Sequence, residues 1–268
     1  LSNVISYFFM DNFPQHWWLM PINYNCKLQK DLWINIFSHL SGLRADLKGS
    51  LFGQHIASDV VLKTVSSFMT DSNPNKPLVF SFHGTTGTGK SHVTKIIARN
   101  LYKKGEQSKH IHLFISDLHF PDKRNLDTYT AQLKQWIHGN VSNFPRSMFI
   151  FDEMDRMHPR LIDTLKPFLD NNDNVDGVSF NKHVCSAGGF SHSSLINKHL
   201  IDHYVPFLPL ELKHVRQCVM AEMVHLNMTQ DSDLADEVAR DMPYYPEEER
   251  IYAFKGCKSV RQKLPLYK

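Results

Sequence analysis

The chain has 268 residues, of which 42% are hydrophobic, and a net charge of +3 at pH 7. This length allows one large domain and a small one, each with apolar surface to bury. The small charge and the absence of a basic block argue against nucleic acid as a partner. The sixteen histidines are scattered, and neither H-E-x-x-H nor C-x-x-C occurs, so these patterns predict no metal site.

No apolar run reaches the roughly 18 residues of a membrane helix. The chain begins at Leu1 rather than methionine, which suggests a fragment or a processed form.

Residues 1–45 form an aromatic-rich segment with neither a helical nor a strand period, and we leave it unassigned. A packing arm, a membrane-facing patch and sequence foreign to the following domain all remain open for it. Beyond this segment, apolar residues recur at helical spacing on either side of Gly49 and Gly53, which predicts two helices. A turn over residues 71–77 then leads into the next strand.

An apolar strand over residues 78–82 enters a glycine-rich turn, and a helical segment over residues 92–101 leaves it. The turn matches the whole G-x-x-x-x-G-K-[ST] P-loop pattern. Glycines let backbone N–H groups surround phosphate oxygens, and the helix N-terminus adds a partial positive charge. We expect Lys90 to reach the β and γ phosphates of ATP, and the Ser91 hydroxyl to hold Mg²⁺. The predicted nucleotide-binding residues are Gly84, Thr85, Thr86, Gly87, Thr88, Gly89, Lys90 and Ser91.

A second strand over residues 111–115 and a helix over residues 126–137 precede an apolar run that ends in two acids, Asp152 and Glu153. Strands that alternate with helices predict an α/β fold: a three-layer parallel sheet with helices on both faces. At the carboxyl end of a buried strand, Asp152 would hold Mg²⁺ through water, and Glu153 would polarise the attacking water. This combination is typical of ATPases of the AAA+ type, and Glu153 favours hydrolysis over simple switching.

Five motifs give the chain, from about Leu47 to Leu264, a resemblance to the torsin family. They lie at residues 51–55 (LFGQH), 118–121 (LHFP), 150–155 (IFDEMD), 204–211 (YVPFLPLE) and 255–260 (KGCKSV). The resemblance implies an AAA+ nucleotide-binding domain over residues 46–210 and a small α-helical lid over residues 211–268. In the lid, apolar spacing predicts one amphipathic helix over residues 212–226 and a second over residues 234–242.

The torsin resemblance also implies an activity and a location. Torsins are AAA+ ATPases of the endoplasmic reticulum lumen and nuclear envelope lumen, with a chaperone-like role in membrane homeostasis. They assemble with other torsin subunits. They lack an arginine finger, which a membrane-anchored luminal activator of the lamina-associated polypeptide type supplies in trans. The resemblance makes Lys258 the sensor 2 cation near the γ phosphate. It makes Asn140 a glycosylation acceptor, and a second sequon begins at Asn227.

Two cysteines, Cys218 and Cys257, match torsin cysteines that join the lid to its nucleotide-sensing loop. In an oxidising lumen they would form a disulfide that closes a loop of about 40 residues, worth about 3–4 kcal/mol. Two buried thiols are the alternative. Because Lys258 follows Cys257, we hypothesise that redox state modulates nucleotide binding. Torsins mostly carry Asn after the P-loop lysine, whereas this chain has Ser91, which is the better Mg²⁺ ligand.

After Glu153 the chain departs from the AAA+ pattern. The sheet needs a fourth strand between the P-loop strand (the Walker A strand) and the strand that ends in Asp152 (the Walker B strand). This fourth strand should end in a polar sensor 1 residue, but residues 176–190 hold no run of five apolar residues. The domain is therefore expected to be incomplete around residues 181–190. Each buried backbone group left unpaired costs about 1–3 kcal/mol. Either other residues close the sheet or the chain folds poorly.

Three functions follow from these patterns. The first is a torsin-like ATPase that uses ATP and Mg²⁺. The second is a hydrolysis-deficient torsin variant that binds nucleotide or partners without turnover, which the missing strand favours. The third is a P-loop small-molecule kinase, which the Asp-Glu strand end and the lysine-bearing lid disfavour.

Overall fold

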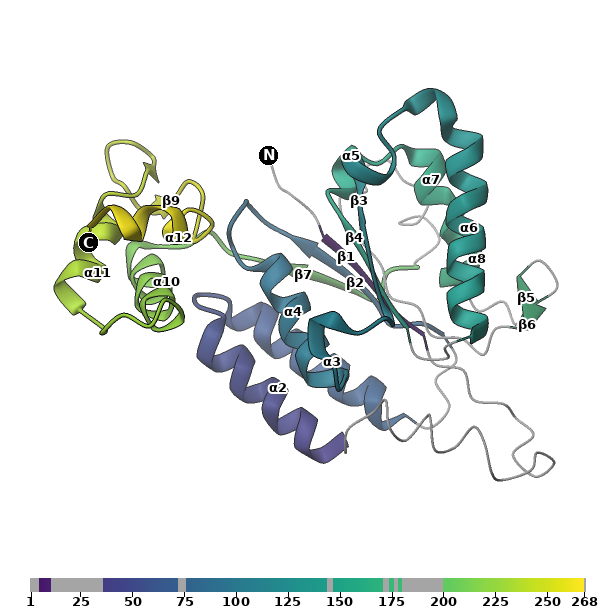
Figure 1. Cartoon of the computed structure of the whole chain (residues 1–268), viewed down its shortest axis with the longest axis horizontal. Coiled ribbons are helices and arrows are strands. Elements are labelled where there is room, and N and C mark those ends of the chain that lie inside the picture. Colours follow the sequence, from purple (N-terminus) through teal and green to yellow (C-terminus); the bar gives the residue numbers. More distant parts are fainter. Residues whose placement is uncertain are drawn as a thin grey trace.

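The computed structural model describes residues 5–10, 36–71, 76–143, 147–170, 174–175, 178–179 and 200–267. A five-stranded sheet lies between two groups of helices, and a small C-terminal lid stands beside them (Figure 1). The predicted α/β architecture with a helical lid is confirmed. Among the described helices, none is long and apolar enough to cross a membrane.

The sheet has the order β3-β4-β1-β2-β7. β3 pairs with β4 in parallel, and β2 pairs with β7 in parallel. β1 lies between these two pairs and runs antiparallel to both of its neighbours. The sheet is therefore parallel, as predicted, except at its centre. Its strands are β1 (Ile5–Met10), β2 (Val79–His83), β3 (Ile111–Ile115), β4 (Ser147–Asp152) and β7 (His203–Pro206).

The position of β1 resolves the alternative that the sequence left open for the sheet. A strand between the P-loop strand and the Walker B strand was expected to be missing, and residues 5–10 of the unassigned N-terminal segment occupy that position. The residues around 181–190, where the domain was expected to be incomplete, lie outside the described part of the chain. Among the described residues between 171 and 190, the chain forms a short hairpin of β5 (Asn174–Val175) and β6 (Val178–Ser179).

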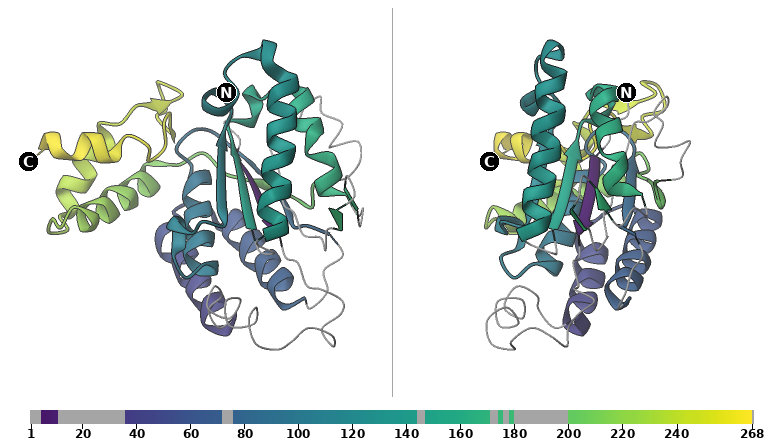
Figure 2. Two further views of the ribbon diagram at one scale, coloured as in Figure 1. Left: turned by 45° about the vertical axis from the view of Figure 1, so that its right-hand side comes forward. Right: turned by 90° about the vertical axis from the view of Figure 1, so that its right-hand side faces the viewer.

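Helices cover both faces of the sheet, as the two further views confirm (Figure 2). One group comprises α2 (Ile36–Ser50), α3 (His55–Thr70) and α4 (Lys90–Leu101). The other comprises α6 (Leu126–Asn143), α7 (Pro159–Thr164) and α8 (Lys166–Leu169). α2 and α3 are the two helices predicted around Gly49 and Gly53. Further one-turn helices in this domain are α5 (Ser116–His119), η1 (Gly105–Gln107), η2 (Lys123–Asn125) and η3 (Met154–Arg156).

The core forms where the apolar strands meet the helices. Phe80 and Phe82 of β2, and Phe149 and Phe151 of β4, are almost wholly buried. Consecutive buried positions on β2 and β4 indicate strands covered on both faces, as their unbroken apolar sequences predict. Packing of these side chains fixes the strand ends from which the P-loop and the acidic pair project.

The lid has a small core of its own, built on Val215, Val219, Val238 and Leu264. Its first helix matches the predicted one, and its second lies two residues earlier than predicted. Its elements are α10 (Leu212–His225), α11 (Ser232–Arg240), β8 (Tyr244–Tyr245), β9 (Tyr252–Ala253), α12 (Val260–Lys263) and η4 (Leu264–Tyr267).

Candidate nucleotide-binding site

The P-loop connects the end of β2 to the start of α4. Gly84, Gly87 and Gly89 have φ angles of 152°, 74° and 107°, a region that residues with a Cβ rarely adopt. Gly89 is the N-cap of α4, and no side chain caps this helix. The first N–H groups of α4 therefore point toward the loop, in the arrangement by which helix N-termini bind anions.

Lys90, the first residue of α4, lies inside the P-loop. Its Nζ donates hydrogen bonds to the carbonyls of Gly84 (2.9 Å) and Thr85 (2.7 Å), and the residue is 4% exposed. Burial lowers the pKa of Lys90 to about 8, although the charges of Asp152 and Asp155 act in the opposite direction. A buried ammonium of this kind gains from an anionic ligand, which returns some of the charge stabilisation that water would supply.

The hydroxyl of Thr85, within the P-loop, is also buried, and it has no hydrogen-bond partner among the described residues. Gly84 and Thr85, whose carbonyls accept the hydrogen bonds from Lys90, do not line the cleft beside the P-loop. The other six predicted residues, Thr86 to Ser91, do line it. Two P-loop residues therefore hold the lysine through their carbonyls, and the other six face the cleft.

Asp152 and Glu153 stand at the carboxyl end of β4. Burial raises the pKa of Asp152, and the neighbouring Glu153 charge raises it further, whereas Lys90 and Lys258 lower it. The Glu153 N–H donates to Asp152 Oδ1 at 2.9 Å, and Glu153 has a φ of 57°. A non-glycine residue in the left-handed region is strained, and such strain concentrates at functional sites. Arg156 Nη1 donates a hydrogen bond to Asp117 and lies 3.6 Å from Glu153 Oε2.

The lid contacts the P-loop directly. The Cys257 N–H donates to the Gly87 carbonyl at 3.0 Å, and a Cβ placed on Gly87 would lie 1.9 Å from the Lys255 carbonyl oxygen. A disulfide joins Cys257 to Cys218 on α10, with the two Cα atoms 6.0 Å apart. The expected pairing of these cysteines is confirmed. The disulfide therefore ties the main lid helix to the loop that touches the P-loop.

These elements enclose a cleft of about 720 Å³, within the usual size range of small-molecule sites. The cleft brings the predicted residues Lys90, Ser91, Asp152, Glu153 and Lys258 together. Its remaining walls include residues for which the sequence analysis predicted no role: Leu51, Phe52, His92, Glu222, His225 and Arg261. Leu51 and Phe52 belong to a torsin motif, which was the only available signal for them.

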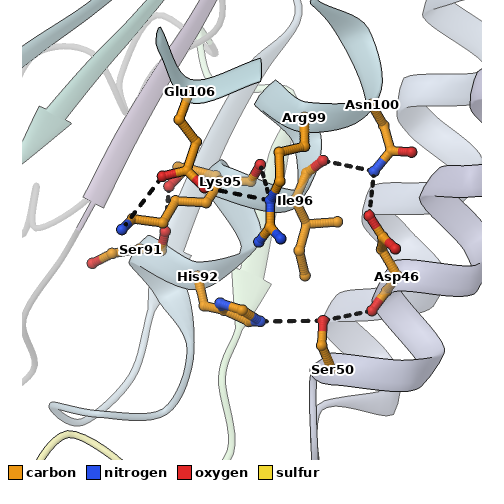
Figure 3. Close-up of polar contacts among 10 residues, drawn as sticks. Asp46, Ser50, Ser91, His92, Lys95, Ile96, Arg99, Asn100 and Glu106 are labelled. Carbon is orange, nitrogen blue, oxygen red and sulfur yellow. Dashed lines mark hydrogen bonds and ion pairs between the residues drawn. The ribbon is translucent and has the colours of Figure 1, made fainter. Parts of the chain in front are cut away.

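Side chains of α2 hold the helix that follows the P-loop (Figure 3). His92 Nε2 lies 3.2 Å from Ser50 Oγ, and Asn100 Nδ2 donates to Asp46 Oδ2 at 2.8 Å. Burial, with the charges of nearby basic residues, lowers the pKa of His92, so a neutral ring is favoured at this contact. No motif marks these residues, because the contacts join positions far apart in the sequence.

Gln54 links two of the torsin motifs behind the P-loop. Its Nε2 donates to the Leu208 carbonyl and its Oε1 accepts from the Leu208 N–H, both at 2.7 Å. Gln54 is 1% exposed. This residue therefore fixes the segment after β7 to the start of α3.

The predicted glycosylation acceptor lies on a helix. Asn140 is half-buried in α6, and its Nδ2 donates to the Trp136 carbonyl at 2.8 Å. Asn227 is exposed in the turn after α10, with a φ of 54°. Glycosylation of Asn140 remains a prediction, and the exposed turn makes Asn227 the more accessible sequon. Among the described residues, no group of three His, Cys, Asp or Glu side chains is placed to hold a metal ion.

Two family models match the chain. One, described as Torsin, covers residues 23–151, and the other, Torsin-1A, C-terminal domain, covers residues 210–267. The first match begins upstream of Leu47, so the torsin resemblance extends into the unassigned segment. Neither match includes residues 1–22 or 152–209.

Solved structures of Hsp104 share the fold. The S. cerevisiae Hsp104–ADP complex matches at 16% identity with a TM-score of 0.62, covering 85% of this chain and 46% of that one. A closed-state reconstruction of Hsp104 with ATPγS and FITC casein matches at 17% identity and a TM-score of 0.58, covering 84% and 46%. The chain thus spans about half the length of these proteins, and at such identity the likeness shows the AAA+ fold alone.

Proposed function

This chain belongs to the torsin family, and we propose that it binds ATP with Mg²⁺ in the cleft between the P-loop and the lid, and hydrolyses it. The observation that carries the proposal is the convergence of Lys90, Asp152 and Lys258 on one cleft of about 720 Å³. Two cations and a carboxylate from three distant segments suit a polyphosphate and its metal ion.

The chain's residues divide the work of phosphoryl transfer. P-loop N–H groups and Lys90 bind the phosphates, and Lys258 approaches them from the lid. Ser91 and Asp152 would hold Mg²⁺, which neutralises phosphate charge when bound. Glu153 orients the attacking water, and Arg156 lies 3.6 Å from its carboxylate. Since the lid loop bonds Gly87, nucleotide binding and lid position are coupled.

The family supports a wider role. We propose a chaperone-like ATPase of the endoplasmic reticulum and nuclear envelope lumen, which works with other torsin subunits and a membrane-anchored activator of the lamina-associated polypeptide type. The disulfide supports an oxidising compartment, because such bonds persist there. The activator would supply an arginine in trans.

A hydrolysis-deficient, nucleotide-binding variant is the second candidate. The observation that favours it is the direction of β1, whose carboxyl end points away from the edge that carries Asp152. In the AAA+ pattern the sensor 1 residue stands at the carboxyl end of the central strand. The carboxyl end of β1 lies at the opposite edge of the sheet from Asp152, so it cannot supply that residue. Binding without efficient turnover would follow.

Titration with a fluorescent ATP analogue, combined with phosphate release in the presence and absence of the activator's luminal domain, tests both candidates. Lys90→Met should lose binding, whereas Glu153→Gln should keep binding and lose any turnover. Activator-stimulated phosphate release would support the ATPase, and binding without release would support the second candidate. Lack of binding by the unaltered chain would contradict both, and a phosphorylated small molecule would indicate a kinase.

A further inference from the structure

Strand β1 separates the two strands that carry the phosphate chemistry (Figure 1). In the sheet order, β2 and β4 are not neighbours, and each pairs with β1 instead. Hydrogen-bonded strands lie about 4.8 Å apart, so β2 and β4 stand roughly two spacings from each other. Their relative position therefore depends on the strand between them.

The register shows how β1 sets that position. Ile5 is opposite Phe82 on one side and Asp152 on the other, and Phe8 is opposite both Val79 and Phe149. One strand thus aligns the end of β4 with the end of β2, just before the P-loop begins. The Asp152 carboxylate and the P-loop are brought to the same edge of the sheet by this alignment.

The origin of β1 differs from that of its neighbours. Residues 5–10 lie upstream of the torsin match, which begins at residue 23, whereas most of β2, β3 and β4 lies within it. Every residue of β1 except Ser6 has a large apolar or aromatic side chain. Such sequences favour strands covered on both faces.

We propose that Ile5–Met10 is a replacement central strand, and that it positions Asp152 relative to Lys90 for nucleotide binding. The role in nucleotide binding rests on the proposed function, whereas the placement of the strand does not. Antiparallel pairing satisfies the backbone groups of β2 and β4 as a parallel strand would, and it needs no particular residue at the carboxyl end. Residues 5–10 are therefore part of the nucleotide-binding domain.

A cross-linking experiment tests the placement without relying on nucleotide. Ser6 is opposite Ser81, and directly opposed residues have Cα atoms about 4.5–5.5 Å apart, within disulfide range. The matched control pairs Ser6 with Ser147, which is opposite Met10, about 13 Å farther along the strand. Both double variants, Ser6→Cys/Ser81→Cys and Ser6→Cys/Ser147→Cys, would carry Cys26→Ser and Cys185→Ser.

We expect a mild oxidant to link the Ser6/Ser81 variant within one chain, as seen by peptide mapping, and to leave the control unlinked. Equal linking of both variants, no linking, or linking only between two chains would overturn the placement. If the intramolecular link forms but the unaltered chain binds no ATP analogue, the placement holds and the proposed function fails.

Two substitutions at one position test the consequence for the site. Phe8→Pro removes an N–H from a strand paired on both sides, whereas Phe8→Val keeps the N–H and the preference for strand. We expect Phe8→Pro to lose ATP-analogue binding and Phe8→Val to keep it. Parental binding by Phe8→Pro would overturn the positioning role. Equal loss in both variants, together with a failed cross-link, would also do so.

Discussion

The P-loop corner and the centre of the sheet place opposite demands on the sequence. At Gly87 an added Cβ would lie 1.9 Å from the Lys255 carbonyl oxygen, so only glycine allows the lid loop to approach the P-loop this closely. At the centre, β1 runs against the direction of its neighbours and lies upstream of the family match, yet it pairs with both. The contrast shows that chemistry in this domain depends on particular residues, whereas sheet closure depends on backbone pairing.

Substitution of Gly87 should have the largest effect. Gly87→Ala places a Cβ in the left-handed region, at a cost of roughly 1–2 kcal/mol, and also against the backbone of the lid loop. We expect loss of ATP-analogue binding and faster proteolysis of the lid.

Gly139 in α6 provides the control, because a Cβ there meets nothing within 4 Å. Gly139→Ala should leave binding unchanged and raise stability by up to about 1 kcal/mol. Normal binding by Gly87→Ala would remove the distinction between the two regions.

Loss of the disulfide should be the next largest effect. The double variant Cys218→Ser/Cys257→Ser lacks the disulfide between two residues that are 39 positions apart in the sequence. We expect this loss to reduce the free energy of unfolding by about 4 kcal/mol. Urea denaturation measures this, with Cys26→Ser/Cys185→Ser as the control. Because the Cys257 N–H bonds Gly87, we also expect reductant to weaken ATP binding by the unaltered chain but not by the double variant. Equal affinity with and without reductant, in a chain shown to hold the bond, would exclude redox modulation.

A smaller effect is expected at Gln54, where two torsin motifs meet outside the cleft. Gln54→Ala leaves the Leu208 N–H and carbonyl without their side-chain partner, at a cost of about 1–3 kcal/mol. Gln135→Ala, at an exposed position of α6, should change stability little. Equal midpoints for the two variants in urea would show that the Gln54 contact adds nothing.

The smallest effect concerns pH. Burial lowers the pKa of Lys90 to about 8, and bound phosphate favours the protonated ammonium. ATP affinity should therefore be highest below pH 8 and fall as pH rises above it, by at most about tenfold per unit. Lys90→Arg stays charged throughout this range and should bind with a flatter profile. A flat profile for the unaltered chain between pH 7 and 9 would show that this lysine does not titrate there.

Much of the fold and the site followed from local sequence. The P-loop strand, the Asp152 strand and the first lid helix lie where the sequence predicts them, because each is a continuous apolar run with clear ends. The contacts of Gln54 with Leu208 and of His92 with Ser50 were not predictable, since each joins segments distant in sequence. The left-handed backbone at Glu153 also had no sequence signal, because glycine usually marks such turns.

The sequence by itself determined which residues form the P-loop and the acidic strand end, and it indicated the family of the chain. Lys90, Ser91 and Asp152 lie within short motifs, and the geometry of such motifs depends on neighbouring residues. Only the tertiary structure decided that residues 5–10 close the sheet, and in which direction. An aromatic-rich segment can pair with any open strand edge, because backbone donors and acceptors are the same in every residue but proline. Residues 5–10 pair where they do because β2 and β4 each have an edge that only a strand between them can satisfy.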